Sequence, residues 1–151
     1  MATNESEPCL PITQITIDLI VSTHVDSKIR QQGADAIVSA LADITYLRLP
    51  RHNITAIENL ECLGPVTNVY LQYNLIRTID VDSLSCLTKL RFLTLAGNLI
   101  CEVPDMRILS NLMLLDLLDN QISSLECTYF PEKLAFLTLK NNPINQREDY
   151  R

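Results

Sequence analysis

Few residues in this sequence have the type and spacing that chemistry requires. The two histidines, His24 and His52, lie far apart, and neither has a cysteine or carboxylate at the spacing of a metal site. Asp116 and Asp119 are the best candidates for an acid–base pair, because we expect them on one strand and the turn after it. Without an apolar pocket or a third polar partner, they are better interpreted as charges that face solvent or a partner. We therefore predict a protein that is not an enzyme and that needs no metal or cofactor.

The cysteines and one pair of aspartates also suggest structural roles. Cys62, Cys86 and Ile108 occupy one equivalent position in a repeated pattern, which predicts core packing. Asp80 and Asp82 could begin a cation-binding loop, but the rest of a calcium-binding pattern is missing. Five cysteines without a C-x-x-C pair predict reduced, buried thiols in a cytoplasmic protein; they are Cys9, Cys62, Cys86, Cys101 and Cys127.

Composition limits the classes of partner. The 151 residues include 12 basic and 18 acidic side chains, which give a formal charge of -6 and a pI near 4.8. An acidic chain without a basic stripe is poorly suited to direct nucleic-acid binding. No apolar run approaches the ~20 residues of a membrane-spanning helix, and the amino end is too polar for a secretory signal. We predict a cytoplasmic protein that contacts neither nucleic acid nor membrane.

The elements that must position these residues are copies of one pattern, L-x-x-L-x-L-x-x-N-x-I. The second leucine position falls at residues 47, 69, 93, 115 and 137, with intervals of 22, 24, 22 and 22. Five copies at a nearly fixed period predict an α/β leucine-rich-repeat solenoid of about five repeats. We expect a parallel sheet on its concave side and 3₁₀ or short helical turns on its convex side. The copies span residues 44–54, 66–76, 90–100, 112–122 and 134–144.

The asparagine of the pattern is expected to turn the chain away from each strand. Its amide can satisfy backbone groups of neighbouring turns, so stacked copies predict a structural ladder of Asn74, Asn98, Asn120 and Asn142. In the first copy His52 stands in place of the asparagine and can only partly imitate it. The two extra residues of the longer interval fall within residues 80–83 and predict a polar surface bulge.

Outside the repeats we predict three regions. Residues 1–11 form a mobile arm, residues 12–43 a helical amino-terminal cap, and residues 44–151 the repeat array with an incomplete carboxyl-terminal cap. Residues 12–21 suit a strand by their β-branched content and a helix by their spacing; we choose the helix. Residues 22–33 are expected to connect it to a second helix over residues 34–42, whose inner face would be Ile37, Val38 and Leu41.

The variable strand positions carry most of the functional information. They should point to the concave face and gather aromatic side chains there, which is typical of a protein-binding surface. The alternative is that they cover the sheet or pack against a terminal segment of the same chain. The candidate partner-binding residues are Tyr46, Arg48, Arg51, Tyr70, Gln72, Tyr73, Phe92, Thr94, Leu114, Asp116, Leu118, Asp119, Phe136, Thr138 and Lys140.

This face would suit an amphipathic helix or an extended segment of another protein. Arginines at one end, Arg48 and Arg51, and aspartates further along, Asp116 and Asp119, would orient that partner by charge. The small residues Ala96 and Gly97 predict an open central floor where a partner approaches the sheet closely.

Several strings resemble the short-repeat class of intracellular leucine-rich-repeat proteins. They are residues 57–61, 69–72, 90–98, 115–117 and 130–131. The class includes a phosphatase regulatory subunit, a dynein light chain and a spliceosomal subunit, and the strings are most similar to a member associated with cilia and flagella. The resemblance implies a non-enzymatic component of a ciliary or flagellar axoneme that binds axonemal or cytoskeletal proteins. A phosphatase- or dynein-targeting subunit and a nuclear ribonucleoprotein scaffold are the alternatives.

The carboxyl end resembles the opening of the terminal cap of this class, through residues 142–143 and Tyr150 with Arg151. The apolar edge of the last repeat needs cover, so we expect either that the sequence is a short or truncated form or that a neighbouring protein supplies the missing layer. That edge consists of Leu134, Leu137, Leu139 and Ile144.

Overall fold

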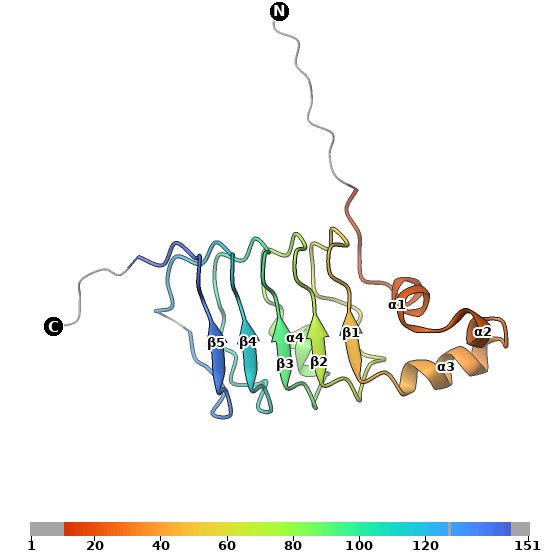
Figure 1. Ribbon diagram of the computed structural model, residues 1–151. Helices are drawn as coiled ribbons and strands as arrows, with labels where there is room; N and C mark the ends of the chain where they lie inside the picture. The colour runs from red at the N-terminus through yellow and green to blue at the C-terminus, as the bar shows by residue number, and fades with distance from the viewer. Residues whose placement is uncertain (1–10, 127, 146–151) are drawn as a thin grey trace, which may run out of the picture.

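The computed structural model describes residues 11–126 and 128–145, and the repeats form a continuous stack (Figure 1). One parallel sheet has the strand order β1-β2-β3-β4-β5, so every strand pairs with those of the preceding and following repeats. The predicted solenoid is confirmed, with about four turns. The strands are β1 Tyr46–Arg48, β2 Asn68–Tyr70, β3 Phe92–Thr94, β4 Leu114–Asp116 and β5 Phe136–Thr138.

Each strand is three residues long, and only its middle side chain points into the stack. Leu47, Val69, Leu93 and Leu115 are all completely buried, while the residues on either side of each face outward. Because side chains alternate along a strand, the leucines of the pattern supply the core and leave the intervening positions free. The core runs without a break from the amino-terminal cap to Ile122.

The segments that return from one strand to the next contain the predicted 3₁₀-type turns. Apolar residues spaced by three are joined by backbone hydrogen bonds from residue i to i−3, which close each turn against the core. The bonds run from Leu63 to Leu60, Leu87 to Leu84, Leu90 to Leu87, Leu109 to Met106 and Leu112 to Leu109.

The longer interval, where a polar surface bulge was predicted around residues 80–83, contains a short helix, α4 Val81–Ser85. The Asp80 carboxylate caps this helix by accepting hydrogen bonds from the backbone of Asp82 and Ser83 and from the Ser83 hydroxyl. These bonds, led by the Ser83 side chain, lower the pKa of Asp80. Asp80 therefore has a structural role at a helix start.

The asparagines bind the repeats to one another. The Asn98 amide donates to the carbonyls of Leu71 in the preceding repeat (3.0 Å) and Leu95 in its own (2.9 Å), and its oxygen accepts from the Ile76 amide (3.0 Å). Asn74, Asn120 and Asn142 make the same set of contacts one repeat apart. Each amide thus joins two turns of the solenoid whose residues are 20–27 positions apart in sequence.

The first repeat has no preceding repeat to contact, which explains why His52 suffices there. Its Nδ1 lies 2.6 Å from the Pro50 carbonyl oxygen, closing the turn within the repeat itself. Its backbone amide donates to the Asn74 side chain at 2.8 Å, so the ladder still begins at this repeat.

The amino-terminal cap differs in detail from the expected one. Residues 12–16 are extended, not helical: Thr13 pairs in parallel with Ile54, and the Asn59 amide donates to the Ile15 carbonyl at 2.7 Å. The predicted connection over residues 22–33 contains the end of a first helix and a short second one. The helices are α1 Ile17–His24, α2 Ser27–Arg30 and α3 Ala34–Ala42, beyond β1 in Figure 1.

Two predictions about buried side chains are wrong. In α3, Val38 is 64% exposed, because the helix turns Ile37 and Leu41 toward the array and leaves Val38 on the outer side. Among the cysteines of the described residues, Cys62 and Cys101 are exposed and Cys86 is half-buried, and all three are free thiols. Ile108, at the same repeat position as Cys62 and Cys86, is also 56% exposed. At this position Cys62 and Ile108 face solvent, whereas Cys86 packs partly against the core.

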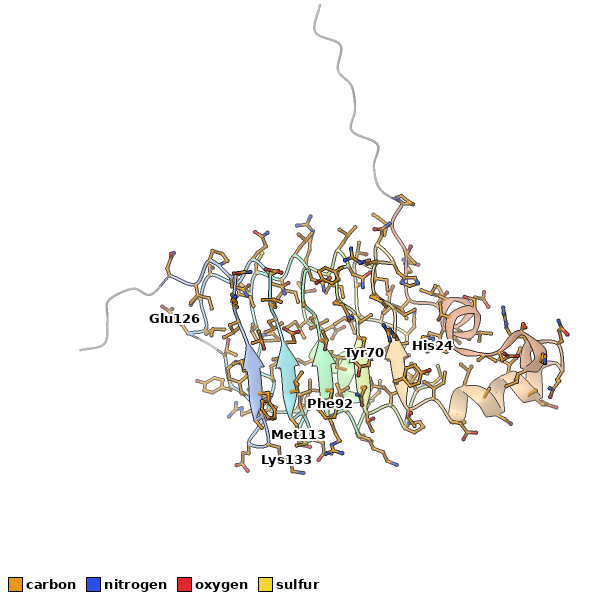
Figure 2. The ribbon with its side chains drawn as sticks, in the orientation of Figure 1. His24, Tyr70, Phe92, Met113, Glu126 and Lys133 are labelled. Carbon is orange, nitrogen blue, oxygen red and sulfur yellow. The ribbon has the colours of Figure 1, made fainter. Side chains whose placement is uncertain are left out.

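His24 attaches the cap to the edge of the sheet. Strand β1 has no neighbour on that side among the described residues, so its outward backbone amide needs an acceptor. The Arg48 amide donates to His24 Nε2 at 2.9 Å, and His24 Nδ1 lies 3.2 Å from the Ile20 carbonyl oxygen. Since Nε2 accepts a hydrogen bond, this imidazole must be neutral. Its ring also packs beside Tyr46, with the ring centroids 5.8 Å apart (Figure 2).

The other end of the stack is more open. Leu137 in β5 is 38% exposed, whereas its equivalents in the first four repeats are completely buried. Leu134, Leu139 and Ile144 are only partly buried. Two predicted features lie outside the described residues. They are the cap at Tyr150 and Arg151 and the arm over residues 1–11, of which only residue 11 is described.

The position of His24 predicts a pH-dependent stability. Burial lowers the pKa of His24 from its ordinary value of 6.5; the Ile20 carbonyl opposes this shift and the charge of His52 adds to it. Between the lowered pKa and 6.5 the unfolded chain binds a proton that the folded chain does not. The free energy of unfolding should therefore be highest above that range and fall as the pH decreases through it.

Urea unfolding of the wild type and of His24→Gln, at about pH 7.5 and about pH 5.5, measures this effect. Glutamine offers an acceptor that does not titrate, and His52 is present in both proteins. We expect the wild type to lose more stability than the variant on acidification. An equal loss in both proteins would contradict the proposed role of His24.

Candidate functional site

The sheet register aligns the predicted partner-binding residues into rows that cross the strands. In the first row each residue is directly paired with the next, so neighbours lie about 4.8 Å apart and the row extends for about 19 Å. Phe136 is 64% exposed and Tyr46 is 52% exposed, while the three residues between them are half-buried. The row consists of Tyr46, Asn68, Phe92, Leu114 and Phe136.

The second row is polar, particularly at its amino-terminal end. The Thr67 hydroxyl donates to the Asn68 side chain at 2.7 Å, and the Asn68 amide donates to the Tyr70 hydroxyl at 2.9 Å. This network fixes Tyr70 over β2 and lines a shallow hollow of about 430 Å³ with Tyr46 and Arg48. The row consists of Arg48, Tyr70, Thr94, Asp116 and Thr138.

The remaining candidates follow the strands in the turns. One position of the repeat, the second after each strand, is occupied by Pro50, Gln72, Ala96, Leu118 and Lys140. From Gln72 onward, the backbone carbonyl at this position accepts a hydrogen bond of 2.8–3.2 Å from a backbone amide of the preceding repeat. The donating amide belongs to the next position of that repeat, so that Arg51 donates to Gln72 and Tyr73 donates to Ala96. The residues at that next position all have positive φ, from 54° to 66°, because the chain reverses there. They are Arg51, Tyr73, Gly97, Asp119 and Asn141.

The predicted open floor at Ala96 and Gly97 is wrong. Ala96 is only 4% exposed, and the Tyr73 ring lies over Gly97 so closely that a Cβ there would be 2.4 Å from Tyr73 Cδ1. The Arg51 guanidinium in turn lies 4.3 Å from the centre of the Tyr73 ring, a cation–π contact. The space beside Gly97, where another residue would have a side chain, is therefore filled by a tyrosine ring of the same chain.

The two aspartates that suggested acid–base chemistry are engaged in local bonds. Asp116 accepts from the Leu118 backbone amide at 3.1 Å, and Asp119 accepts from the Asn141 side chain at 2.7 Å. Both carboxylates thus stabilise the turns after β4 and β5. Within residues 11–126 and 128–145, no group of three His, Cys, Asp or Glu side chains is placed to hold a metal ion.

The apolar part of the first row forms an outward-facing strip, which we define as Phe92, Leu114 and Phe136; Phe136 is exposed and the other two are half-buried. It spans the adjacent strands β3, β4 and β5, and the Met113 side chain lies at its margin (Figure 2). The high exposure of Phe136 shows that, in the part of the chain that the structure describes, no terminal segment covers this end of the strip. Contiguous exposed apolar area of this kind is typical of a protein-binding surface.

A basic edge borders this strip, and the sequence interpretation missed it. We define it as Lys89, Arg91 and Lys133, which lie just before β3 and β5 and line one hollow of about 440 Å³ with Asn111 and Met113. All three cations are exposed, and none takes part in an ion pair among the described residues. The repeat period relates only Lys89 and Lys133, which occupy one position two repeats apart with Asn111 between them.

A larger hollow of about 660 Å³ lies among the turns that follow the asparagines. Ile79, Val103 and Pro104 line it, and its charged residues, Arg77, Glu102 and Glu126, are of mixed sign. Mixed charge around an apolar floor favours no particular class of ligand, so the sheet face remains the better candidate.

Known structures share this architecture. A leucine-rich-repeat protein of Leptospira interrogans matches with a TM-score of 0.60 and 26% identity, over 74% of this chain and 29% of that one. An internalin C2 (inlC2) of Listeria monocytogenes matches with a TM-score of 0.59 and 29% identity, over 77% and 50%. Another Listeria monocytogenes internalin (inlF) matches with a TM-score of 0.57 and 25% identity, over 73% of this chain and 32% of that one.

No protein-family model matches the chain. The chain covers between 29% and 50% of the length of the three solved proteins that it resembles. Within residues 11–126 and 128–145, no helix has the length and apolar character needed to cross a membrane.

The contact between Tyr73 and Gly97 predicts an energetic coupling. Gly97→Ala should cost stability both because φ is positive and because the new methyl group displaces the Tyr73 ring. In a Tyr73→Ala background only the backbone cost remains, between about 1 and 2 kcal/mol. A double-mutant cycle by urea unfolding should give a coupling energy of about 1 kcal/mol. Equal costs in both backgrounds would show that the ring does not occupy this space.

Proposed function

We propose that this chain, which has the leucine-rich-repeat fold, is a non-enzymatic protein-interaction module that binds its partner through the exposed face of the sheet. The observation that carries the proposal is the apolar strip of Phe92, Leu114 and Phe136, presented on three adjacent strands. A rigid sheet orders few side chains on binding, so aromatic residues placed on it contribute affinity at low entropic cost. Of the solved proteins of similar structure, the one from Leptospira interrogans is a leucine-rich-repeat protein by name.

The part of the partner that binds this face is best interpreted as an amphipathic helix or an extended segment. The row is about 19 Å long, which matches about 13 residues of helix or about six residues of extended chain. Three anchors on successive strands suit an apolar stripe along either kind of segment.

We further propose a cytoplasmic role in a ciliary or flagellar axoneme, with axonemal or cytoskeletal proteins as partners. This finer assignment is supported by the strings similar to leucine-rich repeat-containing protein 46, which is associated with cilia and sperm flagella. The residues concerned include 57–61 and 90–98, which lie in the return segments and repeats of the solenoid.

Removing the apolar strip should weaken partner binding and leave the fold intact. Phe92→Ala with Phe136→Ala truncates two side chains that point away from the core, so the unfolding midpoint should change little. Loss of two of the three anchors should reduce the partner recovered by affinity purification about tenfold or more, as measured by quantitative mass spectrometry.

A matched control is Ile108→Ala with Tyr129→Ala. These side chains are 56% and 55% exposed but lie in the return segments, away from the sheet. Partner recovery should be unchanged with this variant. If both double variants retain the same proteins as the wild type, the sheet face is not the binding site.

Localisation tests the finer proposal. A fluorescently tagged chain expressed in ciliated cells should concentrate along the axoneme, together with an axonemal marker. Recruitment through the strip predicts that the Phe92→Ala, Phe136→Ala variant loses this enrichment. A diffuse cytoplasmic or a nuclear distribution of the wild type would remove the axonemal proposal without affecting the interaction surface.

A further inference from the structure

The cations of the basic edge are positioned but lack a strong acceptor. Arg91 directs its Nε and Nη2 toward the Met113 sulfur, at 3.4 and 3.2 Å, and its guanidinium lies 5.8 Å from the centre of the Phe92 ring. A thioether is a weak acceptor, and a guanidinium has five N–H donors. A carboxylate at this position would form a much stronger, charge-assisted pair with Arg91.

Lys133 is held in a similar way. One of its donors reaches the Asn111 side-chain oxygen at 2.8 Å, and the Asn111 amide is fixed by the Thr88 carbonyl at 2.9 Å. The ammonium group carries three donors, so two remain available for an anion. Glu132 precedes Lys133 in the chain and is exposed, but no ion pair joins them.

The charge of this edge is opposite to that of the whole chain. The formal net charge is -6, yet three cations without ion pairs lie along one margin of the apolar strip. Lys133 and Met113 lie at the same end of the strands as Phe92 (Figure 2). A partner seated on the strip would thus place one of its flanks against positive charge.

We propose that the sheet face binds a segment of a partner protein with an apolar face and carboxylates along one flank, which pair with Lys89, Arg91 and Lys133. The proposal rests on the proposed function, because the apolar strip must provide the main contact. The edge adds sequence selectivity and the orientation of the segment, as charges at the rim of an interface do.

The experiment selects peptides from a random 16-residue display library on the purified wild-type chain. The same library is selected on three variants. The first is Lys89→Glu, Arg91→Glu, Lys133→Glu; the second is Phe92→Ala, Phe136→Ala. The third is a matched control, Lys28→Glu, Arg30→Glu, Arg77→Glu, which has the same formal charge as the first but removes exposed cations elsewhere. Urea unfolding verifies that all four proteins fold.

We expect the wild type to enrich peptides that combine an apolar stripe with Asp or Glu. Such peptides should bind about tenfold or more weakly to the charge-reversed variant, and within about twofold of wild type to the control. Salt should weaken their binding to the wild type, and the charge-reversed variant should enrich basic peptides instead.

Enriched peptides that are neutral or basic on the wild type would overturn the proposed acidic partner while leaving the strip as a binding site. Equal binding of acidic peptides to the charge-reversed variant and to the control variant would also overturn the acidic partner. The same conclusion would follow if single-stranded RNA bound the basic edge and displaced the selected peptides. Selection that is indifferent to Phe92→Ala, Phe136→Ala would instead overturn the proposed function, and this inference with it.

Discussion

The buried asparagine amide is the interaction on which the whole stack depends. A chain that reverses direction once per repeat leaves backbone carbonyls and amides turned inward, where an unpaired group is costly. Asn98 satisfies such groups in two repeats at once, and Asn74, Asn120 and Asn142 do the same in theirs. A side chain with two donors and an acceptor at one point is needed, and asparagine has it at the correct length. The asparagine therefore recurs at one position of each repeat from the second to the fifth.

Because the asparagines and the apolar residues of the pattern fill the inward positions, fold and function are carried by different residues. The middle residue of each strand is fixed by the core, whereas its neighbours face outward and can vary without changing the stack. The same separation explains why no outward residue has to be a leucine. An exposed Phe92–Leu114–Phe136 strip is therefore not a requirement of folding, which makes a role in binding the simpler explanation.

The repeat architecture was predictable from sequence because it is periodic. The sheet register and the 3₁₀-type turns follow from apolar spacing alone. Contacts that break the period were not predictable: Tyr73 covers Gly97, His24 accepts from the edge strand, and Val38 faces solvent. Each depends on the direction of one side chain or the rotation of one helix, which spacing does not determine. The basic edge was missed because its cations lie outside the strands and do not recur in every repeat.

The basic edge also reconciles an acidic chain with an acidic partner. At physiological ionic strength charges are screened beyond about 8 Å, so the net charge of -6 acts weakly on a segment already seated on the strip. Contacts at hydrogen-bond distance then decide its orientation, and Arg91 and Lys133 are the groups within reach of its flank. Acidic segments that lack an apolar stripe would gain no anchoring on the strip. Selectivity for segments that carry both features follows, because each feature alone supplies only part of the binding free energy.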